Sequence, residues 1–244
     1  TSYYDLGSLP NPPFPKGDSL LTDLPAEMAK LGTIGFTGTY EGFLSEFVAH
    51  GRFTTALGNL NLDNLAMSQP DSSSLFVYHG RISPEAFDVG NLFDVAGLGT
   101  VSGTIDIDGS GLRPDIVDAD VNGQLSAVAF NNYTYRNIAI TNGHLYRGTY
   151  DIGQLEMRDP NVQLSFSGMV NFKDKVPVMN FTADIDSANL GALGFLNAEE
   201  EHILTTGLEM RLKGSNIDNM TGTIGVQQLD YVRNGEQYSF RQLT

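Results

Sequence analysis

Apolar residues alternate with polar or small residues along most of the chain, from about Thr33 onward. The alternation is clearest at 105–107, 162–166 and 208–212. A two-residue period is typical of a strand with one apolar and one polar face. Short turn sequences separate these runs: YEG at 40–42, DGSG at 108–111, NN at 131–132, NG at 142–143, DPN at 159–161 and RNG at 233–235. Because strands joined by tight turns pair antiparallel, the pattern predicts an all-β, up-and-down meander.

The first 30 residues do not follow the two-residue period. Residues 1–17 are rich in proline and predict an extended, turn-rich lead-in. Asp18 has the character of a helix cap, and apolar residues then recur at helical spacing at Leu20, Leu21, Leu24, Met28 and Leu31. We expect a short amphipathic helix that ends near Lys30 and closes one end of the β core.

A set of landmarks occurs twice in the same order, about 100 to 110 residues apart. An aromatic-x-GTY sequence at 36–40 returns at 146–150. GTIDIDGS at 103–110 is matched by GLEMRLKGS at 207–215. Self-similarity at a fixed period is typical of units that bury their apolar faces against their neighbours.

Two helix-like or irregular stretches, 84–96 and 188–202, interrupt the alternation at the same place in each copy. The repeat therefore predicts two units, 31–145 and 146–244, that form one continuous sheet. Since the second copy ends within a strand pattern, we expect the chain to be a piece of a longer repeat protein.

The composition allows a large core but disfavours several partners. The chain has 244 residues, 41% of them hydrophobic, with 14 Lys and Arg against 29 Asp and Glu. A formal net charge of -15 with scattered basic residues cannot neutralise a row of phosphates, which argues against nucleic acid and against an anionic bilayer surface. There is no cysteine, so disulfides and thiolate metal sites are excluded.

No motif for catalysis or for a cofactor survives inspection. DIDGSG at 106–111 resembles the first half of a calcium loop, but Val117 occupies the position of the bidentate glutamate and strands flank the loop. The four histidines are far apart, and no GxSxG elbow is present. We expect no enzyme, no metal and no cofactor. A carboxylate pair on a carbohydrate-active β scaffold stays open as an alternative, because its spacing is spatial.

The apolar face has to be covered somehow, by closure into a barrel, by a sandwich or by rolling into an open trough. Periodicity alone favours an ordinary closed core. The residues on this face are aliphatic or Phe, which suits acyl chains, since burying each methylene contributes about 0.8 kcal/mol.

Three stretches resemble the middle region of the TamB family of Bacteroides-type bacteria, within the AsmA-like group. They are LGTIGFTGTYEGFLSEFVAHGRFTTALGNLNLD (31–63), GLGTVSGTIDIDGSGL (97–112) and FNNYTYRNIAITNGHLYRGTYDIGQLEMRDPNVQLSFSGMVNF (130–172). The resemblance covers most of 31–240 through hairpin-sized motifs. It implies a very long periplasmic protein of a Gram-negative bacterium, anchored in the inner membrane at its N terminus. At its C terminus it would meet an outer-membrane barrel protein, TamA or a BamA relative.

Between its ends, this family forms a rolled, taco-like sheet with an apolar groove. The groove is thought to carry phospholipid between membranes and to assist outer-membrane protein assembly. We expect the anchor and the barrel-docking region to lie in parts of a parent protein outside this chain.

The leading hypothesis is a non-enzymatic scaffold segment whose apolar groove binds lipid acyl chains. The alternative is a structural or adhesive β-solenoid with a closed, packed core. The predicted groove residues are Val101, Ile105, Ile107, Ile138, Ile140, Val162, Leu164, Phe166, Phe181, Ile185, Leu208, Met210 and Leu212.

Overall fold

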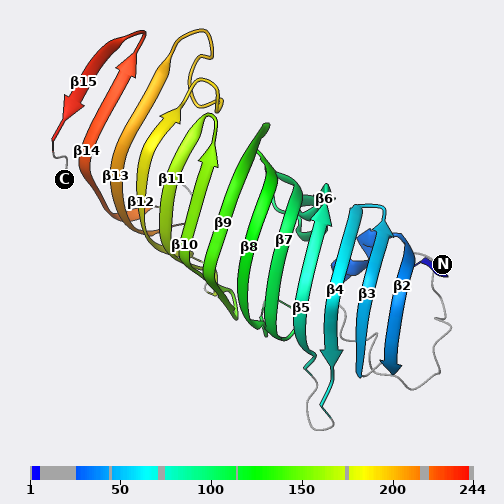
Figure 1. The fold of residues 1–244 in the computed structure, drawn as a ribbon. Helices are drawn as coiled ribbons and strands as arrows, with labels where there is room; N and C mark the ends of the chain where they lie inside the picture. Colours follow the sequence, from blue (N-terminus) through cyan, green and yellow to red (C-terminus); the bar gives the residue numbers. More distant parts are fainter. Residues whose placement is uncertain are drawn as a thin grey trace.

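A computed structural model describes residues 2–5, 26–43, 46–70, 75–113, 115–173, 176–214 and 220–241. They form one antiparallel sheet whose strands follow one another in chain order, apart from the two-residue β6, which pairs with β7 beside the main path. Figure 1 shows the sheet as a long, twisted and curved trough with the N terminus near one end and the C terminus at the other. The sheet is open and does not close into a barrel.

The long strands are connected mostly by short turns, and the described ranges contain two short helical segments. The strands are β1 Ser2–Asp5, β2 Thr33–Phe43, β3 Glu46–Thr55, β4 Gly58–Ser68, β5 Val77–Glu85, β6 Phe87–Asp88, β7 Leu98–Ser110, β8 Asp118–Phe130, β9 Tyr133–Tyr146, β10 Thr149–Asp159, β11 Val162–Asn171, β12 Val178–Asn189, β13 His202–Lys213, β14 Thr221–Arg233 and β15 Glu236–Phe240. The 3-10 helix η2 is Ala26–Leu31, and the α-helix α1 is Val89–Phe93. None of the helices in the described ranges is long and apolar enough to cross a membrane.

The predicted all-β meander is confirmed, and one sheet runs through both predicted repeat units. The predicted helix is seen as η2, and its residues 18–25 lie outside the described ranges. Within the predicted lead-in, β1 pairs with Thr33–Phe36 of β2, a strand that the proline-rich sequence did not reveal.

Three of the predicted turns are real and three are wrong. Turns occur at 131–132, 160–161 and 234–235, as expected. YEG and NG lie inside β2 and β9, and the first three residues of DGSG lie inside β7, which ends just before Gly111. At DGSG the physical reason is close approach: a Cβ on Gly109 would collide with the Ala119 backbone of β8, so this glycine permits strand contact.

β-bulges explain why asparagine occurs inside strands. In β9, Asn137 and Asn142 have φ of 52° and 55°, and the register with β8 shifts beside Asn142. A residue in the left-handed region lets two consecutive side chains face the same side of the sheet. At 136–137 and 141–142 both side chains are exposed, while the buried positions before and after stay on the other face. The bulges therefore interrupt the two-residue alternation in the sequence, but the apolar side chains on both sides of each bulge still point to the same face of the sheet.

Two connections on the same side of the sheet fold back over it. We call them the first rim segment (residues 86–97, containing α1) and the second rim segment (residues 190–201). They follow β5 and β12, which run in the same direction because successive strands of the path alternate. Both coincide with the stretches predicted to interrupt the repeat.

Candidate functional site

One face of the sheet is apolar from end to end. Directly opposed residues on paired strands share a face, so the register can be followed across the whole sheet. One row passes from β2 to β14 through Gly38, Gly51, Leu62, Ile82, Ile105, Gly123, Ile140, Leu155, Phe166, Ala183, Leu208 and Val226. We call the side chains on this side of the sheet the apolar face.

The structure brings all of the predicted groove residues together on the apolar face. Four of them are buried: Val101, Ile138, Val162 and Leu212. The other nine are partly exposed: Ile105, Ile107, Ile140, Leu164, Phe166, Phe181, Ile185, Leu208 and Met210. Their placement is a structural finding, whereas their role in binding lipid stays a prediction.

Among the residues that the structure describes, the two rim segments cover one margin of the apolar face. The first rim segment buries Phe87 and Leu92 in a cluster with Leu31 and Leu57. The second packs Leu193 against Val162 and Ala188, with Leu164, Ile185 and Leu204 around them. No second sheet lies over this face among the described residues.

Large apolar side chains remain accessible near both ends of the sheet. On β2, Tyr40 is 44% exposed, and on β14 Ile224 is 49% exposed. Phe240 of β15 is 49% exposed. Residues of a closed core would be less exposed than this, so within the described ranges the apolar face is open at both ends of the sheet.

Sequence reasoning missed the contribution of β2 to β5 and of β10 and β14. Their apolar-face residues include Phe36, Phe47, Phe53, Leu62, Ile82, Ile152, Leu155, Met157, Ile224, Val226 and Leu229. In β2, glycines alternate with aromatic residues and dilute the signal. In β10 and β14, bulges at 153–154 and 227–228 shift the period, so the pattern reads as irregular.

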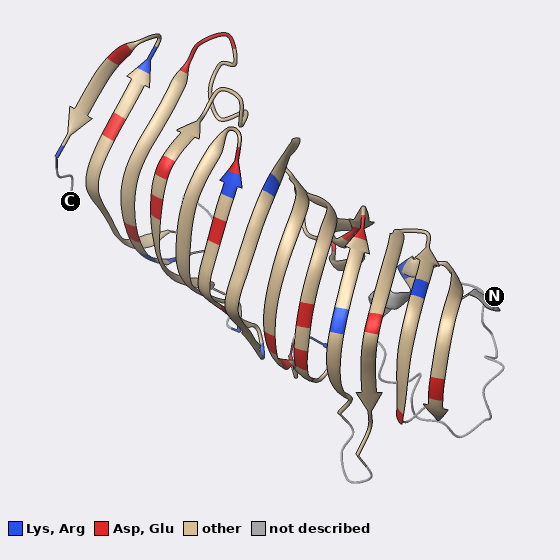
Figure 2. Ribbon diagram, in the orientation of Figure 1, with Lys and Arg blue, Asp and Glu red and all other residues tan. Residues whose placement is uncertain are grey.

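The opposite face, which we call the polar face, carries cross-strand pairs of charged side chains. Figure 2 shows where Lys, Arg, Asp and Glu lie along the strands. Arg81 Nε lies 2.7 Å from Asp106 Oδ1, and this hydrogen bond lowers the pKa of Asp106. Glu85 accepts from Asn61 and from Arg52, and these bonds lower the pKa of the Glu85 carboxyl. Opposite charges on directly paired residues favour the observed register, and they make this the solvent-facing side of the sheet.

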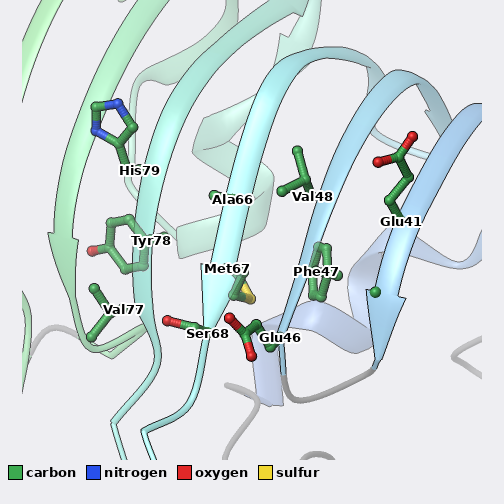
Figure 3. A pocket seen from close by; sticks show the side chains of 11 residues that line it. Glu41, Glu46, Phe47, Val48, Ala66, Met67, Ser68, Val77, Tyr78 and His79 are labelled. Atoms are coloured by element: carbon green, nitrogen blue, oxygen red, sulfur yellow. The ribbon is translucent and has the colours of Figure 1, made fainter.

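A hollow lies on the polar face between β2 and β5 (Figure 3). It measures about 500 Å³, and Glu41, Val48, Ala66 and His79 are successive cross-strand partners in it. The small side chain of Ala66 between larger neighbours accounts for the depression. Ser68 and Glu46 are cross-strand partners in it, but no hydrogen bond joins Ser68 to a base among the described residues, so we assign the hollow no chemistry.

The buried polar residues are explained by structural hydrogen bonds. Asp159, 1% exposed, accepts the Tyr133 hydroxyl at 2.6 Å and the backbone N–H groups of Arg136 and Asn161 at 3.0 and 2.8 Å. Burial and this carboxylate raise the pKa of Tyr133. His202 Nδ1 lies 2.6 Å from the Tyr231 hydroxyl. These contacts tie turns together and leave no reacting group free.

Within the described ranges, no three His, Asp or Glu side chains converge as a metal site would require. Comparisons with protein-family models, with curated proteins and with solved structures give no match. The function is therefore argued from the apolar face itself.

Proposed function

We propose that this chain is a non-enzymatic lipid-binding scaffold segment whose apolar face holds acyl chains. The observation that supports it is an aliphatic and aromatic face that continues across the sheet and that the described residues cover along one margin. Exposed contiguous apolar surface of this extent is rare on soluble monomers and marks a binding surface.

The dimensions suit long tails. Neighbouring strands lie about 4.8 Å apart, so the apolar row across the twelve strands from β2 to β14 extends on the order of 50 Å. A tail lying along such a row gains about 0.8 kcal/mol for each methylene removed from water, less the cost of ordering it. Because the row is uninterrupted, a tail could move along it without crossing a polar barrier.

The TamB-like resemblance supports a finer version of the proposal. In this version the chain lies in the periplasm as part of a parent anchored in the inner membrane, and it conducts phospholipid or assists outer-membrane protein assembly. A TamA- or BamA-like barrel would be met through other parts of the parent. These points rest on the resemblance alone.

The proposal is tested by uptake of a fluorescent fatty acid and by native mass spectrometry for co-purifying phospholipid. Phe166, whose ring lies 5.2 Å from that of Phe181, sits in the middle of the apolar face. Phe166→Asp places a charge in the path of a tail, which would have to be desolvated, so we expect uptake to fall about tenfold or more.

Gln163→Asp is the matched control. Gln163 is exposed on the polar face of the same strand, so water solvates the new charge. It lies directly opposite Arg158, which already pairs with Asp186 at 3.1 Å. We expect its uptake to equal that of the unmodified chain. Unchanged uptake in a folded Phe166→Asp variant, or no lipid and no uptake at all, would overturn the proposal.

The alternative of a structural β-solenoid with a closed core agrees less well with the fold. All strand pairings are antiparallel and the sheet is open. An adhesive role without lipid is the outcome that the uptake experiment would leave standing.

A further inference from the structure

Aromatic and basic side chains gather on the rim opposite the two rim segments. They lie at the turn between β9 and β10 and at the start of the β11–β12 connection. We call Tyr146, Arg147, Tyr150, Phe172 and Lys173 the aromatic–cation cluster. The Arg147 guanidinium carbon lies 5.2 Å from the centre of the Tyr146 ring, and Lys173 Nζ lies 5.5 Å from it. The Tyr150 and Phe172 rings meet edge to face at 5.8 Å.

Backbone hydrogen bonds hold the pieces of this cluster together. The Phe172 N–H donates to the Gly148 carbonyl at 2.8 Å, and the Arg147 N–H donates to the Val117 carbonyl at 2.9 Å. The two cations are thus placed side by side by the fold, although they are far apart in sequence.

These two cations have no carboxylate partner among the described residues. In contrast, Arg52, Arg81 and Arg233 each form an ion pair with an acidic side chain. In a chain of formal charge -15, two adjacent cations without a carboxylate partner in the described part of the chain are unexpected. Their electrostatic attraction is available to an external anion.

The backbone at Arg147 is a second, independent observation. Three two-residue turns have both residues in the left-handed region: 131–132, 147–148 and 234–235. The first residue is Asn131 or Asn234 in two of them, as such turns favour, but it is Arg147 in the third, with φ of 48°. Arg147 is less favourable than Asn in this left-handed conformation. Its presence there suggests a role beyond folding.

The apolar face ends at this cluster. Tyr150 and Val170 are cross-strand partners on the apolar face, and Phe172 follows Val170 by two residues. Phe172 is 56% exposed. A tail that leaves the apolar face on this side would pass Tyr150 and Phe172 and bring its polar end to the two cations.

We propose that the aromatic–cation cluster binds the phosphate-bearing head group of an amphiphile whose tail lies on the apolar face. This inference rests on the proposed function and specifies the class of ligand. The net charge of the chain disfavours spreading on an anionic bilayer, but a single head group needs only the two charges present here.

Two ligands with the same tail test the proposal: palmitoyl lysophosphatidic acid and monopalmitoylglycerol, which differ by the phosphate. Each is titrated below its micelle concentration against a bound fluorescent fatty acid. At about fivefold for each charge, we expect the phosphate-bearing ligand to bind about 25-fold more tightly. The preference should shrink as ionic strength rises.

Arg147→Asn with Lys173→Gln removes both charges. The new Asn suits the left-handed turn, so the melting temperature should stay the same or rise. We expect the phosphate preference to disappear and the affinity for monopalmitoylglycerol to be unchanged. Arg136→Gln, an exposed cation nearer the other rim, is the control and should keep the full preference.

The failures can be told apart. If monopalmitoylglycerol binds but the phosphate preference is absent, or persists in the double variant, the head-group site is overturned and the proposed function stands. If inorganic phosphate alone displaces the phosphate-bearing ligand fully, the site is a free-phosphate site and the proposal is again overturned. If neither ligand binds, the proposed function has failed first.

Discussion

The two rim segments show the same construction built from different sequences. In the first, Asp88 accepts the Asn91 N–H at 2.8 Å, Gly90 is buried, and Leu92 points into a core cluster. In the second, Asn189 accepts the Ala192 N–H at 3.1 Å, Gly191 is buried, and Leu193 does the same. Both rim segments have a capping side chain, a buried glycine and a buried leucine in the same order. The similarity between the two halves of the chain therefore includes the segments that cover the apolar face.

The difference between them is how each is secured. Lys30 Nζ of η2 reaches Asp94 at 2.6 Å and the Asn91 carbonyl at 3.0 Å, so an additional helix braces the first rim segment. The second rim segment is held by Glu200, which accepts from Arg233 at 2.7 Å, and it leaves Phe195 66% exposed. The first rim segment also leaves Phe93 53% exposed, so the two covers differ in the bracing helix and not in having an exposed phenylalanine.

Substitution of the buried glycines should give the largest difference in unfolding free energy between the two rim segments. A Cβ on Gly90 would collide with the Leu98 carbonyl, so Gly90→Ala should lower the free energy of unfolding by about 3 kcal/mol or more. A Cβ on Gly191 would lie 3.0 Å from the Asn197 oxygen, a contact that small shifts relieve, so Gly191→Ala should cost about 1 kcal/mol. Urea denaturation measures both free energies of unfolding. Equal losses in the two variants would contradict the closer backbone contact at Gly90.

Truncation of the two leucines should instead give similar results. Both are buried in apolar clusters, so Leu92→Ala and Leu193→Ala should each lower the free energy of unfolding by about 2 to 3 kcal/mol. Urea midpoints at an unchanged slope would report this. A much smaller effect at Leu193 would show that the second rim segment does not pack on the sheet in solution.

The alternation of apolar residues predicted the fold class, the meander and the common face of residues as distant as Val101 and Leu212. The prediction succeeded because each bulge interrupts the two-residue alternation but keeps the apolar side chains on the same face of the sheet. It failed at NG, where Asn142 provides a bulge rather than a turn, since the same left-handed conformation serves both purposes.

The openness of the apolar face could not be predicted, because a two-residue period says nothing about what lies opposite a strand. The aromatic–cation cluster could not be predicted either. Arg147 and Lys173 are brought together by the Phe172–Gly148 hydrogen bond, which depends on the placement of two connections in the folded sheet.

The capping side chains should have a smaller effect, again equal in the two segments. Asp88→Ala and Asn189→Ala each remove an acceptor for a backbone N–H, at a cost of about 1 kcal/mol. Exchange of the two cap types, Asp88→Asn and Asn189→Asp, should be nearly neutral. Thermal melting of the four variants is the measurement, and a neutral Asn189→Ala would show that the shared construction is only superficial.

The smallest expected effect is a pH dependence confined to the second rim segment. The hydrogen bond from Arg233 lowers the pKa of Glu200 from its ordinary 4.5. A carboxyl whose pKa is lower in the folded state stabilises that state above its unfolded value, and the contribution is lost as the pH falls through the folded value. Glu200→Gln should therefore lower the melting temperature slightly at pH 7, and the difference in melting temperature from the unmodified chain should disappear below pH 4.5.

Glu199→Gln is the control, because it makes the same chemical change at the neighbouring residue. No ion pair is seen at Glu199 in the described part of the chain, so this variant should show no such difference. A gap that persists in acid would mean that the bond to Arg233 does not secure the segment, and that its exposed Phe195 reflects a cover held by packing alone.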